Sequence, residues 1–200
     1  MVRNISGVIL AGGACKRFDG IIKAKIVIDG KTIISRIIEI LSEIFEETII
    51  VTNVPDEFNE YKNCKIIKDL FLDKGPLGGI HSALKETNRE ALFVVAGDMP
   101  FLEKELIVKQ VDFYDNNRCD VLIPQINKYV EPLHGIYKKN ILRNLEEYLE
   151  GENDYAIREF LNIVNTRYMH LEGSGKYTHV FTNINSPSDI SDIQNQRGIR

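Results

Sequence analysis

The chain has 200 residues, of which 44% are hydrophobic and 27% are charged, and this composition predicts a single globular domain over residues 1–200. Its formal net charge is −4 at pH 7, which argues against a broad nucleic-acid-binding surface and remains compatible with a small basic pocket. No apolar run approaches the length of a membrane span, and the first four residues lead directly into a predicted strand, so we expect no signal peptide and a cytoplasmic protein. The three cysteines, Cys15, Cys64 and Cys119, lack metal-ligand spacing and indicate free thiols in a reducing compartment.

Predicted strands and helices alternate along the first two thirds of the chain. Apolar and β-branched runs predict strands at residues 5–10, 25–28, 48–52, 65–68, 91–96 and 120–124. Helical spacing and helix-start signals predict helices at 33–45 with Thr32 as the N-cap, at 55–61, in the later part of 69–84 and at 103–114. Residues 91–96 are apolar throughout, which is typical of a central parallel strand buried on both faces.

The last third of the chain is less regular. We expect an extended segment at 131–137, helices at 142–149 and 157–161, and a strand at 166–171. A final short helix is predicted, with Ser186 as its cap and Pro187 at its first position. Strands that alternate with helices predict an α/β fold with a mostly parallel, doubly wound sheet.

Several glycine and polar residues follow predicted strands. Gly12 comes after the first strand, Asn53 after the strand at 48–52, Asp69 after the strand at 65–68 and Asp98 after the strand at 91–96. Ligands of doubly wound sheets bind outside the carboxyl ends of the strands. We therefore expect these residues to meet at one edge of the sheet, and this placement is stronger evidence for a site than any one motif.

The loop after the first strand combines two adjacent glycines, Gly12 and Gly13, with three cations, Lys16, Arg17 and Lys23. Glycines let backbone N–H groups approach phosphate oxygens closely, and the cations can neutralise the charge of those oxygens. The loop therefore indicates a polyphosphate site, and the alternative is a glycine turn beside solvated cations. Neither G-x-x-x-x-G-K-[ST] nor G-x-G-x-x-G is present, which excludes a P-loop and disfavours a dinucleotide-dependent oxidoreductase.

Two aspartates add a second kind of signal. Asp98 stands two residues beyond the strand at 91–96, where a carboxylate can hold a Mg²⁺ ion that bridges phosphate oxygens; the alternative is a helix-entry aspartate bonded to local amides. Asp69 precedes the Gly-Pro-Leu-Gly-Gly block at 75–79. An acidic acceptor suits the N1–H and N2 donors of guanine, and glycines let the backbone close over a flat base. The alternative for this block is a helix N-terminus entered through a Gly-Pro turn.

Five segments, taken in order, resemble motifs of the molybdenum cofactor guanylyltransferases, which are nucleotidyltransferases built on a Rossmann-like, three-layer α/β domain. They are Leu10–Gly13 with Arg17 and Lys23, Asp69 with 75–79, and the segments 97–102, 132–137 and 181–189. The resemblance covers about residues 6–190. The chain departs from the family pattern at 18–20, where Phe-Asp-Gly replaces Met-Gly, and at Ile22, where the family often has an acidic residue. The reaction class is therefore indicated more closely than the substrate.

The resemblance implies roles for individual residues. It makes Arg17, Lys23 and Asp98 catalytic, and it makes Asp98 a ligand of Mg²⁺ whose shell Asn185 can complete. The nucleotide-binding residues that it implies are Leu10, Ala11, Gly12, Gly13, Lys23, Asn53 (or its neighbour Thr52), Asp69, Gly75, Pro76, Leu77, Gly78 and Asp98. The acceptor-binding residues that it implies are Pro132, Asn183 and Asn185, with the two asparagines on one face if their segment is a strand. His134 lies in the same motif as Pro132, but a lone histidine is more often structural.

The activity that the resemblance implies is transfer of GMP from GTP to the terminal phosphate of molybdopterin-bound molybdenum, with release of pyrophosphate. It assigns nucleotide binding to about residues 1–125 and acceptor binding to about 126–195. We expect GTP and the molybdopterin cofactor as partners, transient contact with other cofactor-biosynthesis proteins, no nucleic acid, no membrane and a monomer. The alternatives are a cytidylyltransferase for the same cofactor, a transferase that acts on a sugar phosphate or phospholactate, and a catalytically silent nucleotide-binding module.

Overall fold

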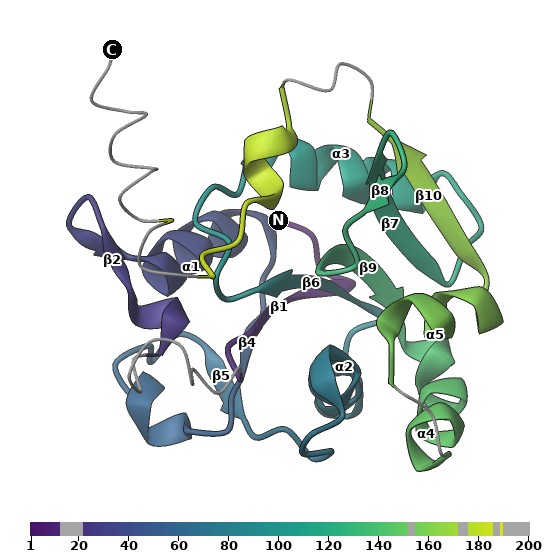
Figure 1. Ribbon diagram of the computed structural model, residues 1–200, viewed down its shortest axis with the longest axis horizontal. Helices are drawn as coiled ribbons and strands as arrows, with labels where there is room; N and C mark the ends of the chain where they lie inside the picture. The colour runs from purple at the N-terminus through teal and green to yellow at the C-terminus, as the bar shows by residue number, and fades with distance from the viewer. Residues whose placement is uncertain (13–21, 152–154, 172–175, 186–188, 190–200) are drawn as a thin grey trace.

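The computed structural model shows a twisted eight-stranded sheet between two layers of helices, and a separate two-stranded sheet of β2 and β3 (Figure 1). It describes residues 1–12, 22–151, 155–171, 176–185 and 189. The strands in these ranges are β1 (Ile5–Leu10), β2 (Val27–Ile28), β3 (Lys31–Thr32), β4 (Thr48–Val51), β5 (Lys65–Ile67), β6 (Ala91–Ala96), β7 (Val121–Ile126), β8 (Tyr129–Val130), β9 (His134–Lys138) and β10 (Thr166–His170). The α-helices are α1 (Ile33–Ile44), α2 (Gly75–Glu86), α3 (Lys104–Asp115), α4 (Leu142–Glu150) and α5 (Ile157–Ile163). Short 3₁₀ helices are η1 (Lys23–Lys25), η2 (Pro55–Phe58), η3 (Lys139–Ile141) and η4 (Thr178–Phe181).

The half of the sheet that ends at β5 is parallel and doubly wound. The strand order is β10-β7-β9-β6-β1-β4-β5, with β8 paired to β7, and β6, β1, β4 and β5 all run in the same direction. From β1 the chain proceeds to β4 and β5 on one side and then crosses to β6 on the other side. The gap between the carboxyl ends of β1 and β6 is therefore a topological switch point, where ligands of such sheets bind. The predicted α/β class and mostly parallel sheet are confirmed.

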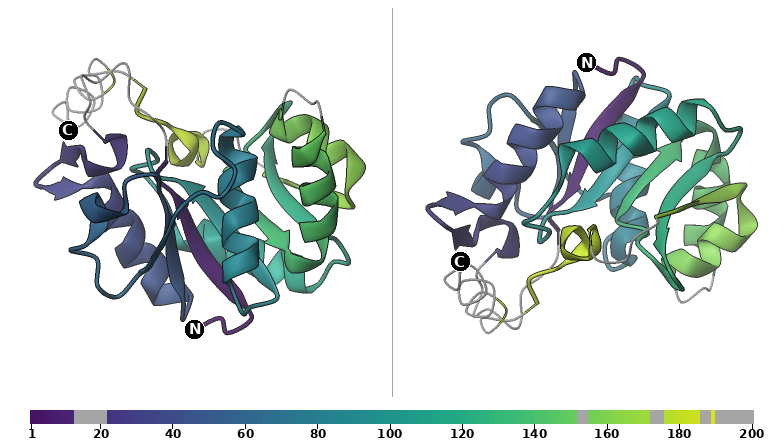
Figure 2. Two further views of the ribbon diagram at one scale, coloured as in Figure 1. Left: turned by 90° about the horizontal axis from the view of Figure 1, so that it is seen from below. Right: turned by 90° about the horizontal axis from the view of Figure 1, so that it is seen from above.

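Helices cover both faces of this sheet. In Figure 2, α1 and α3 lie over one face, and α2, α4 and α5 lie over the other. The predicted N-cap of α1 is confirmed, because Thr32 Oγ1 accepts a hydrogen bond from the Ser35 N–H at 3.2 Å. The apolar face of α1 is buried against the sheet through Ile33, Ile34, Ile37, Leu41 and Ile44. At roughly 1.5–3 kcal/mol for each of these five side chains, burial of this face contributes about 8–15 kcal/mol to stability as an upper estimate.

One local prediction needs correction, and one open alternative is decided by the structure. The strand expected at 25–28 is shorter, since η1 occupies Lys23–Lys25, and the predicted Asp29-Gly30 turn joins β2 to an antiparallel strand β3. Both turn residues have positive φ (49° and 77°), as the mirror-image hairpin turns require. Sequence patterning missed β3 because its two residues run directly into the cap of α1. The alternative offered for the glycine block, a helix N-terminus, is the one that the structure shows, because α2 begins at Gly75 with Pro76 where a helix needs no N–H donor.

The later strands extend the same sheet. The antiparallel strand β9 lies between β6 and β7, and β10 pairs in parallel with β7. Residues 182–185 follow η4 without forming a strand, so the condition under which Asn183 and Asn185 would share one face of a strand is not met. The reason is that the Ile184 N–H donates to the Asp98 carbonyl at 3.0 Å and not to a neighbouring strand. The helix start predicted at Ser186 and Pro187 lies outside the described residues.

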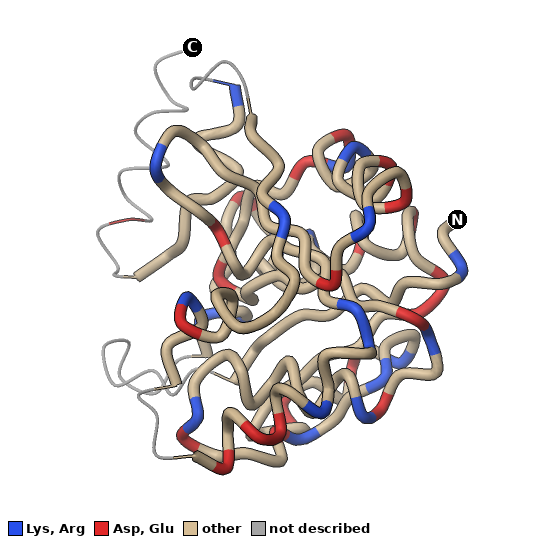
Figure 3. The backbone as a smooth tube through the Cα atoms, turned by 90° about the vertical axis from the view of Figure 1, so that its right-hand side faces the viewer, with Lys and Arg blue, Asp and Glu red and all other residues tan. Residues whose placement is uncertain are grey.

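The described surface carries mixed charge. In Figure 3, acidic and basic residues are interspersed along the helices and loops that face the viewer. Cys64 and Cys119 are free, as predicted, and burial raises the pKa of the Cys64 thiol to about 11; Cys15 lies outside the described residues. In the described ranges, the helices are too short or too polar to cross a lipid bilayer.

Candidate functional site

A cavity of about 440 Å³ opens at the carboxyl ends of β1, β4, β5 and β6. Its lining includes nine of the residues predicted for the site, namely Leu10, Ala11, Gly12, Lys23, Asn53, Asp69, Gly75, Pro76 and Asp98. The other lining residues are Ile22, Ala24, Val51, Asp73, Gly79, Ala96, Gly97 and Leu133. The expected meeting of Gly12, Asn53, Asp69 and Asp98 at one sheet edge is therefore confirmed.

Backbone hydrogen bonds hold the strand ends around this cavity. The Ala11 N–H donates to the Val51 carbonyl at 2.8 Å, and the Gly97 N–H donates to the Leu10 carbonyl at 2.9 Å. Thr52 is fully buried, and its hydroxyl donates to the Ala11 carbonyl at 3.3 Å and accepts from the Val54 N–H at 3.2 Å. Of the two alternatives considered at this position, Thr52 thus fixes the backbone, and Asn53 is the one that lines the cavity.

Lys23 joins three segments that are far apart in the sequence. Its ammonium donates to Asp98 Oδ2 at 3.2 Å and to Asn185 Oδ1 at 3.0 Å. The Lys23 and Asp98 side chains are 23% and 19% exposed, so water screens their attraction less than at an open surface. Met99 is fully buried and fixes the turn that carries Asp98. The arrangement places a cation, a carboxylate and an amide oxygen together at the switch point.

The loop before α2 is shaped by Asp69. Its Oδ1 accepts from the Phe71 N–H at 3.0 Å and from the Ser82 hydroxyl at 3.3 Å, and burial raises the pKa of this carboxyl above its usual value. The Ser82 hydroxyl also accepts from the Leu70 N–H at 2.8 Å. Gly78 lies directly against this network, because a Cβ there would stand 2.5 Å from the Phe71 carbonyl oxygen and 2.9 Å from Asp69 Oδ1.

We expect Gly78→Ala to lower the free energy of unfolding by about 1–3 kcal/mol, because the new methyl group meets backbone that cannot move aside. The matched control is Gly79→Ala in the same helix turn. A Cβ at Gly79 meets the end of the flexible Leu10 side chain at 2.9 Å, and alanine offsets part of that cost through its better helix propensity. Urea unfolding of both variants measures the difference, and equal losses would contradict a specific clash at Gly78.

Several predicted residues lie elsewhere. Leu77 is fully buried in the core beneath α2, and Gly78 is buried behind the cavity wall. Pro132 is also buried, and its carbonyl accepts from the Tyr137 hydroxyl at 2.8 Å. The amide oxygen of Asn183 is buried without a hydrogen-bond partner among the described residues. Gly13 and Arg17 lie outside the described residues.

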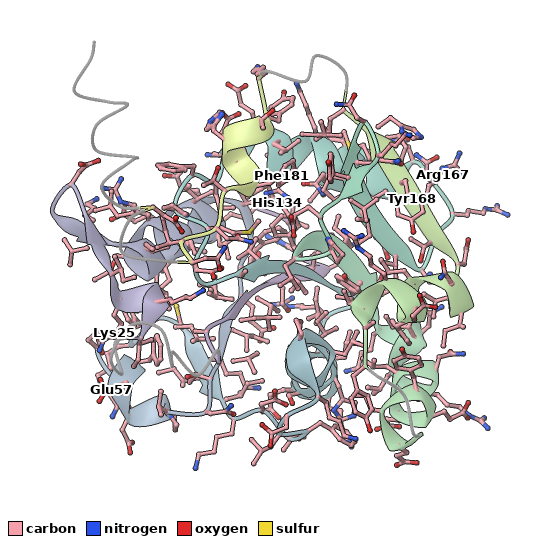
Figure 4. The ribbon with its side chains drawn as sticks, in the orientation of Figure 1. Lys25, Glu57, His134, Arg167, Tyr168 and Phe181 are labelled. Atoms are coloured by element: carbon pink, nitrogen blue, oxygen red, sulfur yellow. The ribbon has the colours of Figure 1, made fainter. Side chains whose placement is uncertain are left out.

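His134 is structural in its surroundings. It is fully buried in β9, and its ring lies edge-to-face between Phe93 at 5.1 Å and Phe181 at 5.2 Å, as Figure 4 shows for the pair His134 and Phe181. Burial lowers the pKa of His134 to about 4, so the imidazole is neutral at physiological pH. The suspicion that a lone histidine in this motif is structural agrees with this environment.

Sequence reasoning missed Asp73 and Leu133 in the cavity lining. Asp73 adopts a positive φ of 64°, in the loop between Asp69 and α2. A signal was available for Asp73, because an aspartate two residues before a glycine-initiated helix is a common turn former. Leu133 gave no polar signal, and it reaches the cavity only because β9 inserts next to β6.

The family model and the similar proteins of known sequence indicate the same family. The MobA-like NTP transferase domain matches residues 7–169. A protein of Natranaerobius thermophilus named "Probable molybdenum cofactor guanylyltransferase" is 35% identical, over 99% of this chain and 98% of the relative. A protein of the same name from Methanosarcina acetivorans is 30% identical, over 96% of this chain and 90% of the relative.

Solved structures agree on the fold. Molybdopterin-guanine dinucleotide biosynthesis protein A from Archaeoglobus fulgidus superposes with a TM-score of 0.82 at 26% identity, covering 98% of this chain and 100% of the other. The 4-diphosphocytidyl-2C-methyl-D-erythritol synthase of Anaerococcus prevotii has a TM-score of 0.72 at 18% identity, covering 99% of this chain and 97% of the other, and shares the fold alone. The chain therefore belongs to the MobA-like NTP transferase family of nucleotidyltransferases.

Proposed function

We propose that this protein transfers GMP from GTP to the molybdopterin form of the molybdenum cofactor and releases pyrophosphate. The observation that supports it most is the contact of Lys23 with both Asp98 and Asn185 at the edge of a cavity of about 440 Å³. The relatives named as probable molybdenum cofactor guanylyltransferases are similar in sequence over nearly the whole length of this chain. This similarity favours the same substrates.

The residues around Lys23 suit a divalent metal. Asp98 Oδ2 and Asn185 Oδ1 converge on one cationic group, the Lys23 ammonium, at 3.2 and 3.0 Å. Both are hard oxygen donors of the kind that Mg²⁺ prefers. In the described ranges no three His, Cys, Asp or Glu side chains cluster, so the phosphates and water would supply most ligands, as is usual for Mg²⁺. We propose that Asp98, with Asn185, holds Mg²⁺, which would offset charge on the triphosphate.

Binding in the cavity would orient the reacting groups. An oxygen of the acceptor's terminal phosphate attacks the α-phosphorus of GTP, the bond from this phosphorus to the β-phosphate oxygen breaks, and pyrophosphate leaves with the electron pair. The attacking oxygen is already anionic, so no general base is needed. Lys23, with Arg17 from the part of the loop that the structure does not describe, would neutralise charge as it develops on the phosphates. Alignment of the acceptor phosphate with the α-phosphate of GTP would supply the rest of the rate acceleration.

The two parts of the domain would divide the substrates. We propose that residues 1–125 bind GTP through the cavity and that residues 126–195 bind the pterin through the surface next to Asn185. We propose further that the protein acts as a monomer in the cytoplasm, receives the pterin through transient contact with another cofactor-biosynthesis protein, and binds neither nucleic acid nor membrane. Pro132 and Asn183 would then hold the acceptor-binding surface in place from the protein interior, since the Pro132 carbonyl and the Asn183 amide oxygen are buried.

The test is calorimetric titration with GTP, CTP, ATP and UTP in the presence of Mg²⁺. Selective binding of GTP is the expected result, together with loss of its Mg²⁺ dependence in Asp98→Ala. Asp112→Ala on the exposed side of α3 is the matched control, because Asp112 lies outside the cavity lining. A preference for CTP would support the cytidylyltransferase alternative, and nucleotide binding without pyrophosphate release in the presence of the pterin would support a catalytically silent module.

A further inference from the structure

The cavity has two ends with different chemistry. Lys23 of η1 is paired with Asp98, which follows the end of β6, and Asp69, Asp73 and the start of α2 lie beyond the end of β5. The strands β6 and β5 are three strand spacings apart, roughly 14 Å. If the phosphates occupy the cationic end, an extended nucleotide places its base at the acidic end.

Of the two carboxylates at the acidic end, Asp69 is already engaged. Its Oδ1 accepts hydrogen bonds from the Phe71 N–H and the Ser82 hydroxyl, and a Cβ at Gly78 would stand 2.9 and 3.1 Å from its two carboxylate oxygens. These contacts hold the loop 69–74 against α2. Asp69 therefore shapes the wall of the cavity through Oδ1, whereas both carboxylate oxygens of Asp73 are unengaged among the described residues.

Asp73 differs from Asp69 in its surroundings. It is exposed, it lines the cavity, and among the described residues its carboxylate makes no hydrogen bond or ion pair. Two free carboxylate oxygens can accept two parallel hydrogen bonds from adjacent N–H donors. Guanine is the nucleobase whose Watson–Crick edge carries two adjacent donors, the N1–H and the N2 amino group.

The backbone of Asp73 is also held in place. The adjacent Lys74 donates a hydrogen bond to the Tyr155 hydroxyl, and its ammonium lies 3.7 Å from the centre of the Tyr155 ring. The Tyr155 hydroxyl in turn donates to the Gly151 carbonyl at 3.1 Å, behind α4. These contacts fix the backbone next to Asp73, which lowers the cost of ordering this loop when a ligand binds.

We propose that Asp73 is a specificity-determining residue that accepts hydrogen bonds from the N1–H and N2 amino groups of guanine. This inference rests on the proposed function, since it needs GTP bound with its phosphates at Lys23. It assigns base choice to a residue outside the motifs that the chain shares with its family, and it gives Asp69 and the Lys74–Tyr155 contact positioning roles.

The experiment compares GTP with ITP, which lacks only the N2 amino group, and with 2′-deoxy-GTP, in calorimetric titrations with Mg²⁺. The variant is Asp73→Asn, because asparagine keeps the shape and tolerates the positive φ of 64°, and the control is Asp112→Asn on α3. We expect the unaltered protein to bind GTP at least about tenfold more tightly than ITP. In Asp73→Asn the GTP affinity should fall by about tenfold or more, and the preference for GTP over ITP should shrink towards unity.

Other outcomes separate the two claims. Unaltered GTP selectivity in Asp73→Asn overturns the role of Asp73 and leaves the proposed function standing. An equal loss for GTP and ITP overturns it as well, and a loss that 2′-deoxy-GTP escapes would assign Asp73 to the ribose. Failure of the unaltered protein to bind any nucleotide overturns the proposed function and this inference together.

Discussion

Replacing Lys23 with alanine should lower the rate of nucleotidyl transfer by about 10²–10³-fold, the usual effect of removing one preorganised group that stabilises developing charge. Lys23 is the described cation that contacts Asp98 and Asn185 in the cavity. Its removal leaves Asp98 without that counter-charge and leaves the pyrophosphate leaving group less stabilised. Pyrophosphate release under saturating GTP and pterin measures the effect, and the loss should fall mainly on kcat.

The neighbouring Lys25 is the matched control for this change. Both lysines belong to η1, but Lys25 lies outside the cavity lining and pairs with Glu57 and Glu60 at 3.5 and 3.2 Å, as Figure 4 shows for Lys25 and Glu57. Exposed pairs of this kind contribute about 0–1 kcal/mol to stability. Lys25→Ala should therefore change the transfer rate less than about threefold. Similar losses in both variants would show that η1 matters through its fold and not through the Lys23 charge.

The parallel half of the fold was predictable because local patterns and tertiary structure agree there. The uninterrupted apolar run at 91–96 became a strand buried at every position, and Thr32 became the cap of α1. The strand ends then placed Gly12, Asn53, Asp69 and Asp98 around one cavity. The reason is geometric, since the carboxyl ends of parallel strands share one edge.

The features that sequence patterning missed depend on contacts between distant segments. Asn185 was expected near Asp98 from the family resemblance, but its contact with Lys23 depends on the hydrogen bond from the Ile184 N–H to the Asp98 carbonyl, between residues far apart in the chain. Asp73 lines the cavity because the loop before α2 is bent by Asp69 and by positive φ at Asp73 and Gly75. The glycine block was ambiguous between loop and helix because Gly78 is required by close packing, which a single sequence does not reveal.

Replacing His134 with phenylalanine should remove a pH-dependent loss of stability. Burial lowers the pKa of His134 to about 4 in the folded protein, against about 6.5 for an exposed histidine. Above pH 6.5 the imidazole is neutral in both the folded and the unfolded chain, so it adds no pH dependence. Between about pH 6.5 and 4 the unfolded chain binds a proton that the folded protein does not, so the free energy of unfolding falls by up to roughly 3 kcal/mol. A phenylalanine ring cannot titrate and keeps the edge-to-face contacts with Phe93 and Phe181.

Urea unfolding of each protein at pH 7.5 and at pH 4.5 gives the change in the free energy of unfolding between the two pH values. A packing cost that phenylalanine introduces is present at both pH values and cancels in this change. His170→Phe is the control, because it makes the same replacement at an exposed site on β10. Equal acid sensitivity of the unaltered protein and His134→Phe would contradict a buried neutral imidazole.

Phe181 covers this ring and leads into the segment that brings Asn185 to Lys23. Protonation of His134 should therefore loosen the acceptor side of the cavity first, and His134→Phe should retain transfer activity to lower pH than the unaltered protein.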